Sequence, residues 1–310
     1  MRLGVMIGAE RGDSARKVSR LLADIEWAEG AGMDTAWIPQ VPNDFDALLA
    51  VALMGTRTTR IELGTAVVPL QAQHPVALAR QALSTHAATG GRLALGVGPS
   101  HHWIIQDMLG LPYQKPAAYT RDYLEVLHAA FAGPGQIDVE NDHFTVHNPN
   151  DLAPVAPLPV LIAALGPVML ALAGEHADGT VLWMAPARAI ETHVAPKLHA
   201  AAAAAGRPAP RIVAGLPVAV HDDIAEARAA ASASSSMYAQ MENYTRILEI
   251  GGAGTPADAA IVGNESSVTS QLQSLLDAGA TDIWAAVFPV GDDRRASMRR
   301  SKDLLRELVR

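Results

Sequence analysis

Residues 61–70 read IELGTAVVPL, and His74-Pro75 follows at the start of an expected helix. A short apolar, β-branched run predicts a buried strand, and proline suits the first turn of a helix. Gly64-Thr65-Ala66 is made of small residues, which allows tight packing where the strand ends. Residues 92–102, RLALGVGPSHH, repeat the pattern with two histidines at the tip. In an α/β barrel the chemistry gathers at such strand ends.

Strand-like and helix-like segments alternate along the whole chain, which predicts a (β/α)8 TIM barrel in one domain over residues 1–310. The expected strands are Leu3–Ile7, Thr35–Pro39, Ile61–Val68, Arg92–Val97, Val160–Ala164, Thr180–Met184, Ile212–Val220 and Thr281–Val287. Insertions are expected after strands 4 and 7. The competing fold, a doubly wound sheet, needs a G-x-G-x-x-G run after strand 1, and Gly8-Ala9-Glu10-Arg11-Gly12 lacks that spacing.

Three local features are also predicted. Residues 136–147 form a β-hairpin that turns at Asn141-Asp142. Asp44 caps a helix that runs to about Arg57. The segment Asp222–Ile250 is helical, and its Met237, Tyr238, Met241 and Tyr244 have helical spacing, which is typical of core or of a lid over the site.

The composition excludes several classes of protein. Of the 310 residues, 49% are hydrophobic and 18% charged, which suffices for a large core. The net charge of −8 and the lack of a basic stripe argue against a nucleic-acid partner. No apolar run approaches the roughly 18 residues of a membrane span, so no membrane partner is expected. The absence of cysteine excludes disulfides and thiolate sites and favours a cytoplasmic location.

The predicted strand ends carry few charged groups. They offer no pair of acids for glycoside chemistry, no cluster for a metal and no lysine for a Schiff base. An apolar, glycine-rich pocket with a few neutral polar groups suits a flat ring system that brings its own chemistry. The arginine pairs Arg294-Arg295 and Arg299-Arg300 are interpreted as a solvated helix face, or else as an anion contact at the mouth of the site.

Three motifs resemble one family over essentially the whole chain. They are residues 63–67 (LGTAV), residues 92–98 (RLALGVG) and residues 165–183, which begin LGPVML and end DGTVLW. The chain looks like the bacterial luciferase-like oxidoreductases, specifically the actinobacterial branch that uses the deazaflavin coenzyme F420. The resemblance implies hydride transfer between coenzyme F420 and a small organic substrate, and a homodimer.

The resemblance also implies a set of cofactor contacts. A non-prolyl cis peptide at Ala66-Val67 would form a bulge that backs the middle ring. The implied contacts are Thr65, Ala66 and Val67 behind the ring, Gly98, Pro99, Ser100 and His101 beside it, Ala164, Leu165 and Gly166 along the ribityl chain, and Pro167 at a helix N-terminus near the phosphate.

Several side chains have two interpretations. Gln40 donates to the ring carbonyl edge or simply caps its strand end. His74 caps a helix or contacts the ligands. His101 is the candidate proton donor. A substrate pocket would include His102, Trp183 and Met184, although core packing also explains the last two.

Two other functions remain open on the same barrel. One is an FMN-dependent luciferase-like monooxygenase, because nothing at the strand ends rules out FMN. The other is a cofactor-free binding protein, against which the small-residue turns at 64–66 and 98–99 speak.

Overall fold

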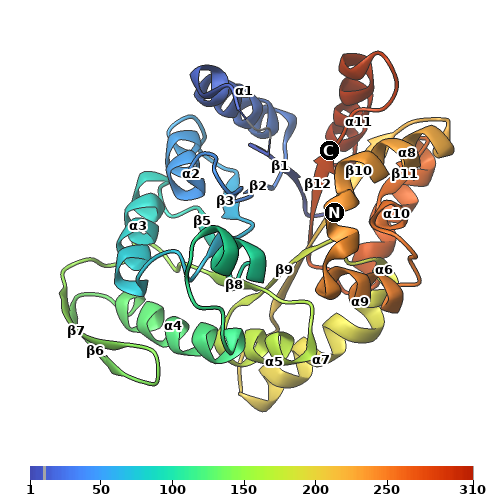
Figure 1. Cartoon of the computed structure of the whole chain (residues 1–310). Helices are drawn as coiled ribbons and strands as arrows, with labels where there is room; N and C mark the ends of the chain where they lie inside the picture. The colour runs from blue at the N-terminus through green and yellow to red at the C-terminus, as the bar shows by residue number, and fades with distance from the viewer. Residues whose placement is uncertain (10–11, 310) are drawn as a thin grey trace.

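A computed structural model describes residues 1–9 and 12–309. It contains a closed barrel of eight parallel strands with helices outside them (Figure 1). The strands are β1 (Leu3–Met6), β2 (Thr35–Ile38), β3 (Glu62–Thr65), β5 (Leu93–Gly98), β8 (Val160–Ala163), β9 (Gly179–Trp183), β10 (Arg211–Val220) and β12 (Asp282–Val287). Their order around the barrel is β1-β2-β3-β5-β8-β9-β10-β12, and β12 pairs with β1. The predicted (β/α)8 barrel is confirmed.

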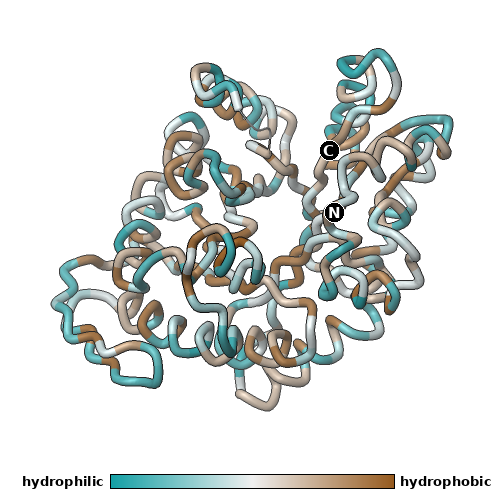
Figure 2. The backbone as a smooth tube through the Cα atoms, in the orientation of Figure 1, coloured by the Kyte–Doolittle hydropathy of each residue, from teal (hydrophilic) through white to brown (hydrophobic). Residues whose placement is uncertain are grey.

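Helices follow the strands and pack on their outer faces. They are α1 (Ser14–Ala31), α2 (Ala47–Gly55), α3 (Pro75–Ala88), α4 (Pro116–Phe131), α5 (Pro167–His176), α6 (Ala187–Ala189) continuing through η2 (Ile190–Val194) into α7 (Ala195–Ala204), α10 (Glu265–Asp277) and α11 (Arg294–Leu308). Figure 2 shows hydrophobic residues along the inner strands and hydrophilic ones on outer turns such as those of α11. Within residues 1–9 and 12–309, no helix has the length and apolar character needed to cross a bilayer.

Both predicted insertions are present. After β5 come η1 (Trp103–Met108), α4 and the hairpin of β6 (Gly135–Glu140) and β7 (Thr145–Asn150). Asn141 stabilises the hairpin turn, because its Oδ1 accepts from the backbone N–H of Phe144 at 2.9 Å. The predicted hairpin is therefore confirmed.

The insertion after β10 contains α8 (Ile224–Ser235), η3 (Ser236–Gln240), α9 (Glu242–Ile250), η4 (Pro256–Ala259) and β11 (Ile261–Gly263). β11 pairs in parallel with the last residues of β10, from Val218 to Val220. The segment 222–250 is helical over most of its length, as predicted, but the short helix η3 separates α8 from α9.

The expected cap of α2 is wrong by two residues. Asp46 is the N-cap, and its side chain accepts from the N–H of Leu49 at 2.8 Å. Asp44 instead pairs with the buried ammonium of Lys17 at 3.1 Å. The predicted segment after strand 1 lies partly outside the described residues, at Glu10 and Arg11, and the single domain over 1–310 stays a prediction.

Tryptophans fill the barrel interior against glycines on neighbouring strands. Gly64 lies in register with Trp37, and a Cβ on Gly64 would stand 2.3 Å from the indole ring. Gly215 lies in register with both Trp183 and Trp284, and its Cβ would stand 2.0 Å from the Trp284 ring. Large side chains facing small ones fill the interior at native density.

An ion cluster lies at the amino-terminal ends of the strands. The Arg211 guanidinium is 2.8 Å from carboxylate oxygens of both Glu62 and Asp282, and Arg2 pairs with the same two acids. Burial opposes ionisation of Asp282, but the bonds from Arg211 outweigh it and hold the pKa of that carboxyl below its usual range. In barrels this face serves stability rather than chemistry.

Candidate active site

The strand predicted over residues 61–68 is broken at its carboxyl end. The Ala66-Val67 peptide bond is cis, as expected, and β4 (Val68–Pro69) resumes pairing with β5. At the break the hydroxyl of Thr65 replaces a strand-to-strand bond. Its Oγ1 accepts from the Gly96 N–H at 2.9 Å and donates to the Gly96 carbonyl at 2.7 Å. The side chain of Thr65 is fully buried, so its role in the structure is to hold the break in place.

Two glycines of β5 make room for this break. A Cβ on Gly96 would stand 1.9 Å from the Thr65 carbonyl oxygen, and one on Gly98 would stand 3.0 Å from Val67 and 2.9 Å from Ala163. Larger residues at either position would displace the chain on both sides. The glycines of the 92–98 motif are thus explained by close packing at the barrel rim.

The inner core of the barrel ends in a partly exposed layer of side chains. Met6, Ala66, Val67 and Trp183 are partly buried and pack on the inner cluster, whose buried members include Trp37 and Trp284. Three of the predicted site residues therefore lie together on one apolar surface. This surface is built from strands β1, β3–β4 and β9, at their carboxyl ends.

His101 follows β5 at the same end of the barrel. Ser100 before it has φ of 60°, and its carbonyl accepts from the Tyr113 hydroxyl at 3.1 Å. The His101 carbonyl accepts the N–H groups of Ile104 and Ile105, which anchors its backbone at the start of η1. Burial lowers the pKa of the imidazole, so the ring is neutral at pH 7.

Aromatic rings continue from His101 across the mouth. The His101 ring lies 6.0 Å from Tyr244 of α9, and Tyr244 lies 4.9 Å from Tyr238 of η3. Tyr238 lies 6.1 Å from Trp183, which stacks on Trp284 at 5.2 Å. We call Trp183, Tyr238 and Tyr244 the aromatic wall. Its tyrosines come from the expected Met/Tyr stripe, and their position over strand ends favours the interpretation as a lid.

The predicted ribityl and phosphate contacts lie between β8 and α5. Ala164 is 2% exposed, and the Leu165 carbonyl accepts from His193 Nε2 at 2.9 Å. Gly166 is the N-cap of α5, has no side-chain cap, and has open space where a Cβ would point. Pro167 occupies the first turn, whose following N–H groups lack helical partners by geometry. This end of α5 has the features of an anion site.

The remaining predicted residues have structural contacts. Gln40 Oε1 accepts from the Ala47 N–H at 2.8 Å, which caps α2 and leaves its amide N–H groups as donors. His74 caps α3 through Val76 and packs on Phe144, as its structural interpretation predicted. Met184 is 1% exposed with φ of 58°, and His102 is exposed beside Tyr113.

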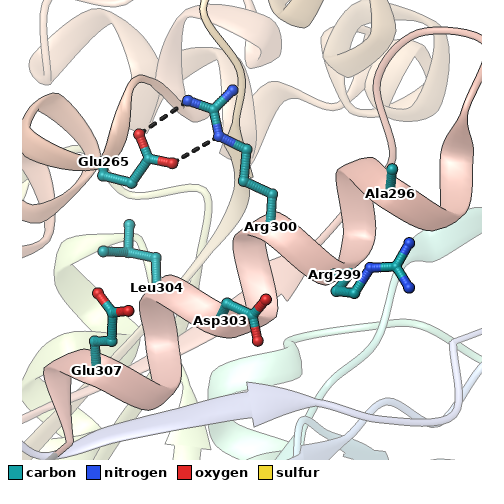
Figure 3. A pocket seen from close by; sticks show the side chains of 7 residues that line it. All are labelled: Glu265, Ala296, Arg299, Arg300, Asp303, Leu304 and Glu307. Atoms are coloured by element: carbon teal, nitrogen blue, oxygen red, sulfur yellow. Dashed lines mark hydrogen bonds and ion pairs between the residues drawn. The ribbon is translucent and has the colours of Figure 1, made fainter.

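Two concave sites lie elsewhere. One, of about 560 Å³, is at the amino-terminal face beside Arg92 and Arg211. The other, of about 330 Å³, lies along α11 (Figure 3), where Arg300 turns toward Glu265 and Arg299 extends away. The hydrogen bonds that the Arg300 guanidinium donates to Glu265 and Asp222 raise the pKa of Arg300, and those two acids hold it in place. This pairing favours the structural interpretation of the second arginine pair.

The sequence patterns did not indicate two supporting residues. Trp284 stacks on Trp183, and Tyr113 donates a hydrogen bond to the Ser100 carbonyl. Trp284 had a signal, since it is a large residue in the middle of the eighth expected strand. Tyr113 had none, because it lies in an irregular stretch.

The fold and the site together define a (β/α)8 barrel protein with an apolar, glycine-lined rim at the carboxyl ends of its strands. The family model for luciferase-like monooxygenases matches residues 1–299, and the chain belongs to that family. A protein of Mycobacterium tuberculosis provisionally named a coenzyme F420-dependent oxidoreductase is 30% identical over 192 residues, which cover 58% of this chain and 54% of that relative. The chain thus matches about half the length of this relative.

Other relatives match over more of their length. The 5,10-methylenetetrahydromethanopterin reductase of Methanolobus tindarius is 25% identical over 300 residues, 88% of this chain and 91% of the relative. The solved structure of the coenzyme F420-dependent tetrahydromethanopterin reductase from Methanopyrus kandleri has a TM-score of 0.81 at 20% identity, covering 100% of this chain and 99% of that one. The FMN-bound oxygenating constituent of 3,6-diketocamphane monooxygenase from Pseudomonas putida has a TM-score of 0.77 at 17% identity. The match covers 100% of this chain and 97% of that one. These two structural likenesses show the fold alone.

Proposed function

We propose that this protein is an oxidoreductase that transfers a hydride between coenzyme F420 and a small organic substrate. The observation that carries the proposal is the break at residues 65–67, where small residues and the β5 glycines build an apolar floor at the strand ends. A flat ring can lie on such a floor without displacing side chains. The relatives named for coenzyme F420 favour the deazaflavin as the ring.

The residues present fit that cofactor. Ala66 and Val67 would lie under the ring, Gly98 to His101 beside it, and the uncapped start of α5 at Gly166 and Pro167 near the phosphate. Gln40 keeps amide N–H groups for a ring carbonyl while its oxygen caps α2. When bound, the deazaflavin supplies two-electron chemistry as hydride. The protein's part is to hold the ring, exclude water and place the substrate above it.

His101 is proposed as the group that exchanges a proton with the substrate. Its neutral imidazole nitrogen accepts a proton at pH 7, which suits oxidation of an alcohol. The expected rate of that oxidation is constant above the lowered pKa of His101 and falls as the pH drops below it. His101→Asn should remove this pH dependence together with most of the activity, and an unchanged profile would exclude the role.

FMN is the second candidate cofactor, because the FMN-bound monooxygenase component has the same fold over the full chain. The net charge of −8 also disfavours the anionic tail of coenzyme F420. The deciding experiment titrates each cofactor into the protein by calorimetry. We expect a micromolar Kd for coenzyme F420 and weaker binding of FMN. Tight FMN binding without deazaflavin binding overturns the cofactor, and binding of neither favours a cofactor-free protein.

A pair of glycine variants tests where the cofactor lies. Gly166 and Gly30 both have open space where a Cβ would point, so both accept a side chain. Gly166→Glu places a negative charge at the proposed phosphate site and should weaken cofactor binding by at least about 10-fold. Gly30→Glu, at an exposed position of α1, is the matched control and should leave the Kd unchanged. Equal effects would reject the phosphate site.

We further propose a cytoplasmic homodimer. The absence of cysteine supports the compartment, and the resemblance to luciferase-like enzymes supports the dimer. Sedimentation at micromolar concentration tests the assembly.

A further inference from the structure

A cavity of about 560 Å³ lies at the amino-terminal face of the barrel, opposite the strand ends where the cofactor is proposed to bind. It extends across several strand starts, because Glu62 begins β3, Leu93 begins β5 and Arg211 begins β10. Pockets of about 300–1,000 Å³ hold small ligands in proteins. The cavity is therefore large enough for a ligand, and the proposed oxidoreductase function does not use it.

Two walls of this cavity are apolar and rigid. Residues 157–159 (Pro-Leu-Pro) line it before β8, and residues 208–210 (Pro-Ala-Pro) line it before β10. Proline fixes its own φ and has no N–H group, so these walls offer mainly hydrocarbon surface. Such a surface favours an apolar ligand body over a strongly hydrated ion.

The charged part of the lining has an excess of positive groups. It consists of Arg92, Arg207, Arg211, Glu62 and Asp178. Three guanidinium groups and two carboxylates give a sum of +1 for the lining. Arg2 and Asp282, which complete the ion cluster beside it, cancel each other. In a chain with a net charge of −8, this lining is locally positive and favours an anion with one negative charge.

The Arg92 side chain is held in place by neutral groups. Its two terminal nitrogens donate to Thr58 Oγ1 and to backbone carbonyls between Gly55 and Ile61, at 2.8 to 3.1 Å. Among the residues that the structure describes, it makes no ion pair. Burial lowers the pKa of Arg92, and the negative charge of Glu29 offsets part of this effect. The guanidinium stays charged at pH 7, so a bound anion would supply the counter-charge that it lacks.

Arg207 keeps donors for a ligand. Its Nη2 donates to the Ala177 carbonyl at 3.0 Å and to Asp178 Oδ1 at 3.2 Å. Within residues 1–9 and 12–309, its Nε and Nη1 have no acceptor. The side chain is 32% exposed, so a ligand in the cavity can reach it. Hydrogen bonds from a guanidinium to a carboxylate are among the strong ones in proteins.

We propose that this cavity is a second ligand site, and that it takes a small organic acid with one carboxylate on an apolar body. The carboxylate accepts from Arg207 in the field of Arg92, and the apolar body packs on the two proline-rich walls. This face of a barrel serves stability rather than chemistry, so the ligand braces the strand starts and does not react. The proposal does not depend on the proposed oxidoreductase function.

The test compares three probes by calorimetry with the full-length protein, at neutral pH and constant ionic strength. Benzoate has the carboxylate and an apolar ring, benzamide is its uncharged analogue, and inorganic phosphate lacks the ring. Benzoate should bind at least about 10-fold more tightly than either of the others. Saturating coenzyme F420 should leave the Kd of benzoate unchanged, because the two sites lie at opposite ends of the barrel.

Variants assign the binding to the cavity. Arg207→Gln should weaken benzoate binding about 10-fold, because it removes the charged donor. Arg80→Gln, at an exposed position of α3 outside the cavity, is the matched control and should leave the Kd unchanged. Asp178→Asn removes a negative charge from the lining and should tighten benzoate binding several-fold. General damage to the fold would not produce this gain.

Four results would overturn the proposal. They are no benzoate binding at millimolar concentration, benzamide binding as tight as that of benzoate, loss of benzoate binding when coenzyme F420 is added, or equal effects of the Arg207 and Arg80 variants. The first three use the unaltered protein, so they decide even if a variant misfolds. Benzoate binding in a protein that does not bind coenzyme F420 would reject the proposed oxidoreductase function alone.

Discussion

Replacing Thr65 by valine should destabilise the barrel strongly although the two side chains have nearly the same shape. The Thr65 hydroxyl both accepts from and donates to Gly96, and the side chain is fully buried. Valine leaves the Gly96 N–H and carbonyl without that partner in a dry interior. Each unmade buried hydrogen bond costs about 1–3 kcal/mol, so we expect a loss of about 2–4 kcal/mol in the free energy of unfolding.

Thr180→Val is the matched control. Thr180 is also fully buried in a barrel strand, but its hydroxyl donates only to the Ile162 carbonyl, at 2.8 Å, among the residues that the structure describes. We expect it to cost about 1 kcal/mol, because no backbone N–H loses its acceptor. Urea unfolding followed by circular dichroism measures the free energy of unfolding of both variants. The two losses can be compared if the variants have equal m values. Equal losses for the two variants would refute the reasoning about the strand break.

Three further predictions concern stability. The Glu29 carboxylate accepts N–H groups of residues 59–61, which outweigh burial and lower its pKa from 4.5 to about 2. The contribution of Glu29 to stability is therefore present above pH 4.5 and is lost as the pH falls toward 2. In urea unfolding, Glu29→Gln should lower the free energy of unfolding by about 1–2 kcal/mol at pH 7 and by clearly less at about pH 3.5. A difference between the two proteins that stays the same at both pH values would contradict this. Gly174→Ala should lower the melting temperature, because its Cβ would stand 2.5 Å from the Leu198 carbonyl and overpacking costs about 1–3 kcal/mol; a rise, as helix propensity alone predicts, would argue against the close contact. Arg211→Met should cost about 3 kcal/mol by leaving two acids underpaired at the barrel base, with unfolding in urea as the measurement and an unchanged midpoint as the contrary result.

The barrel could be predicted because its signals are local and repeated. Each strand is a short apolar run bounded by turn residues, and eight such runs separated by helices leave few other folds. The error at the cap of α2 shows the limit of local signals. Asp44 and Asp46 have the same capping chemistry, and packing of the helix on the barrel, together with the pull of Lys17 on Asp44, decides between them.

The arrangement of the mouth depends on contacts that no local pattern reports. The interruption at η3 has no glycine or proline to announce it within residues 224–241. It places Tyr238 against Trp183, a contact between segments that are distant in the sequence. Helical spacing identified the Met/Tyr stripe, but it favoured core packing over a lid. The small residues at 64–66 and 96–98 were predicted as a tight rim, and the packing distances now give the reason for the glycines Gly64, Gly96 and Gly98.

Strand β10 is long enough to extend past the point where the barrel closes, and β11 attaches to that extension through backbone pairing from Val218 to Val220. The loop that carries Tyr238 and Tyr244 is thereby tethered at both ends by main-chain bonds that do not depend on side-chain identity. Its residues can be exchanged while the scaffold beneath keeps its stability. Variants that accept new substrates should therefore accumulate changes in this loop at little thermodynamic penalty, which makes it the first region to randomise when redirecting the enzyme.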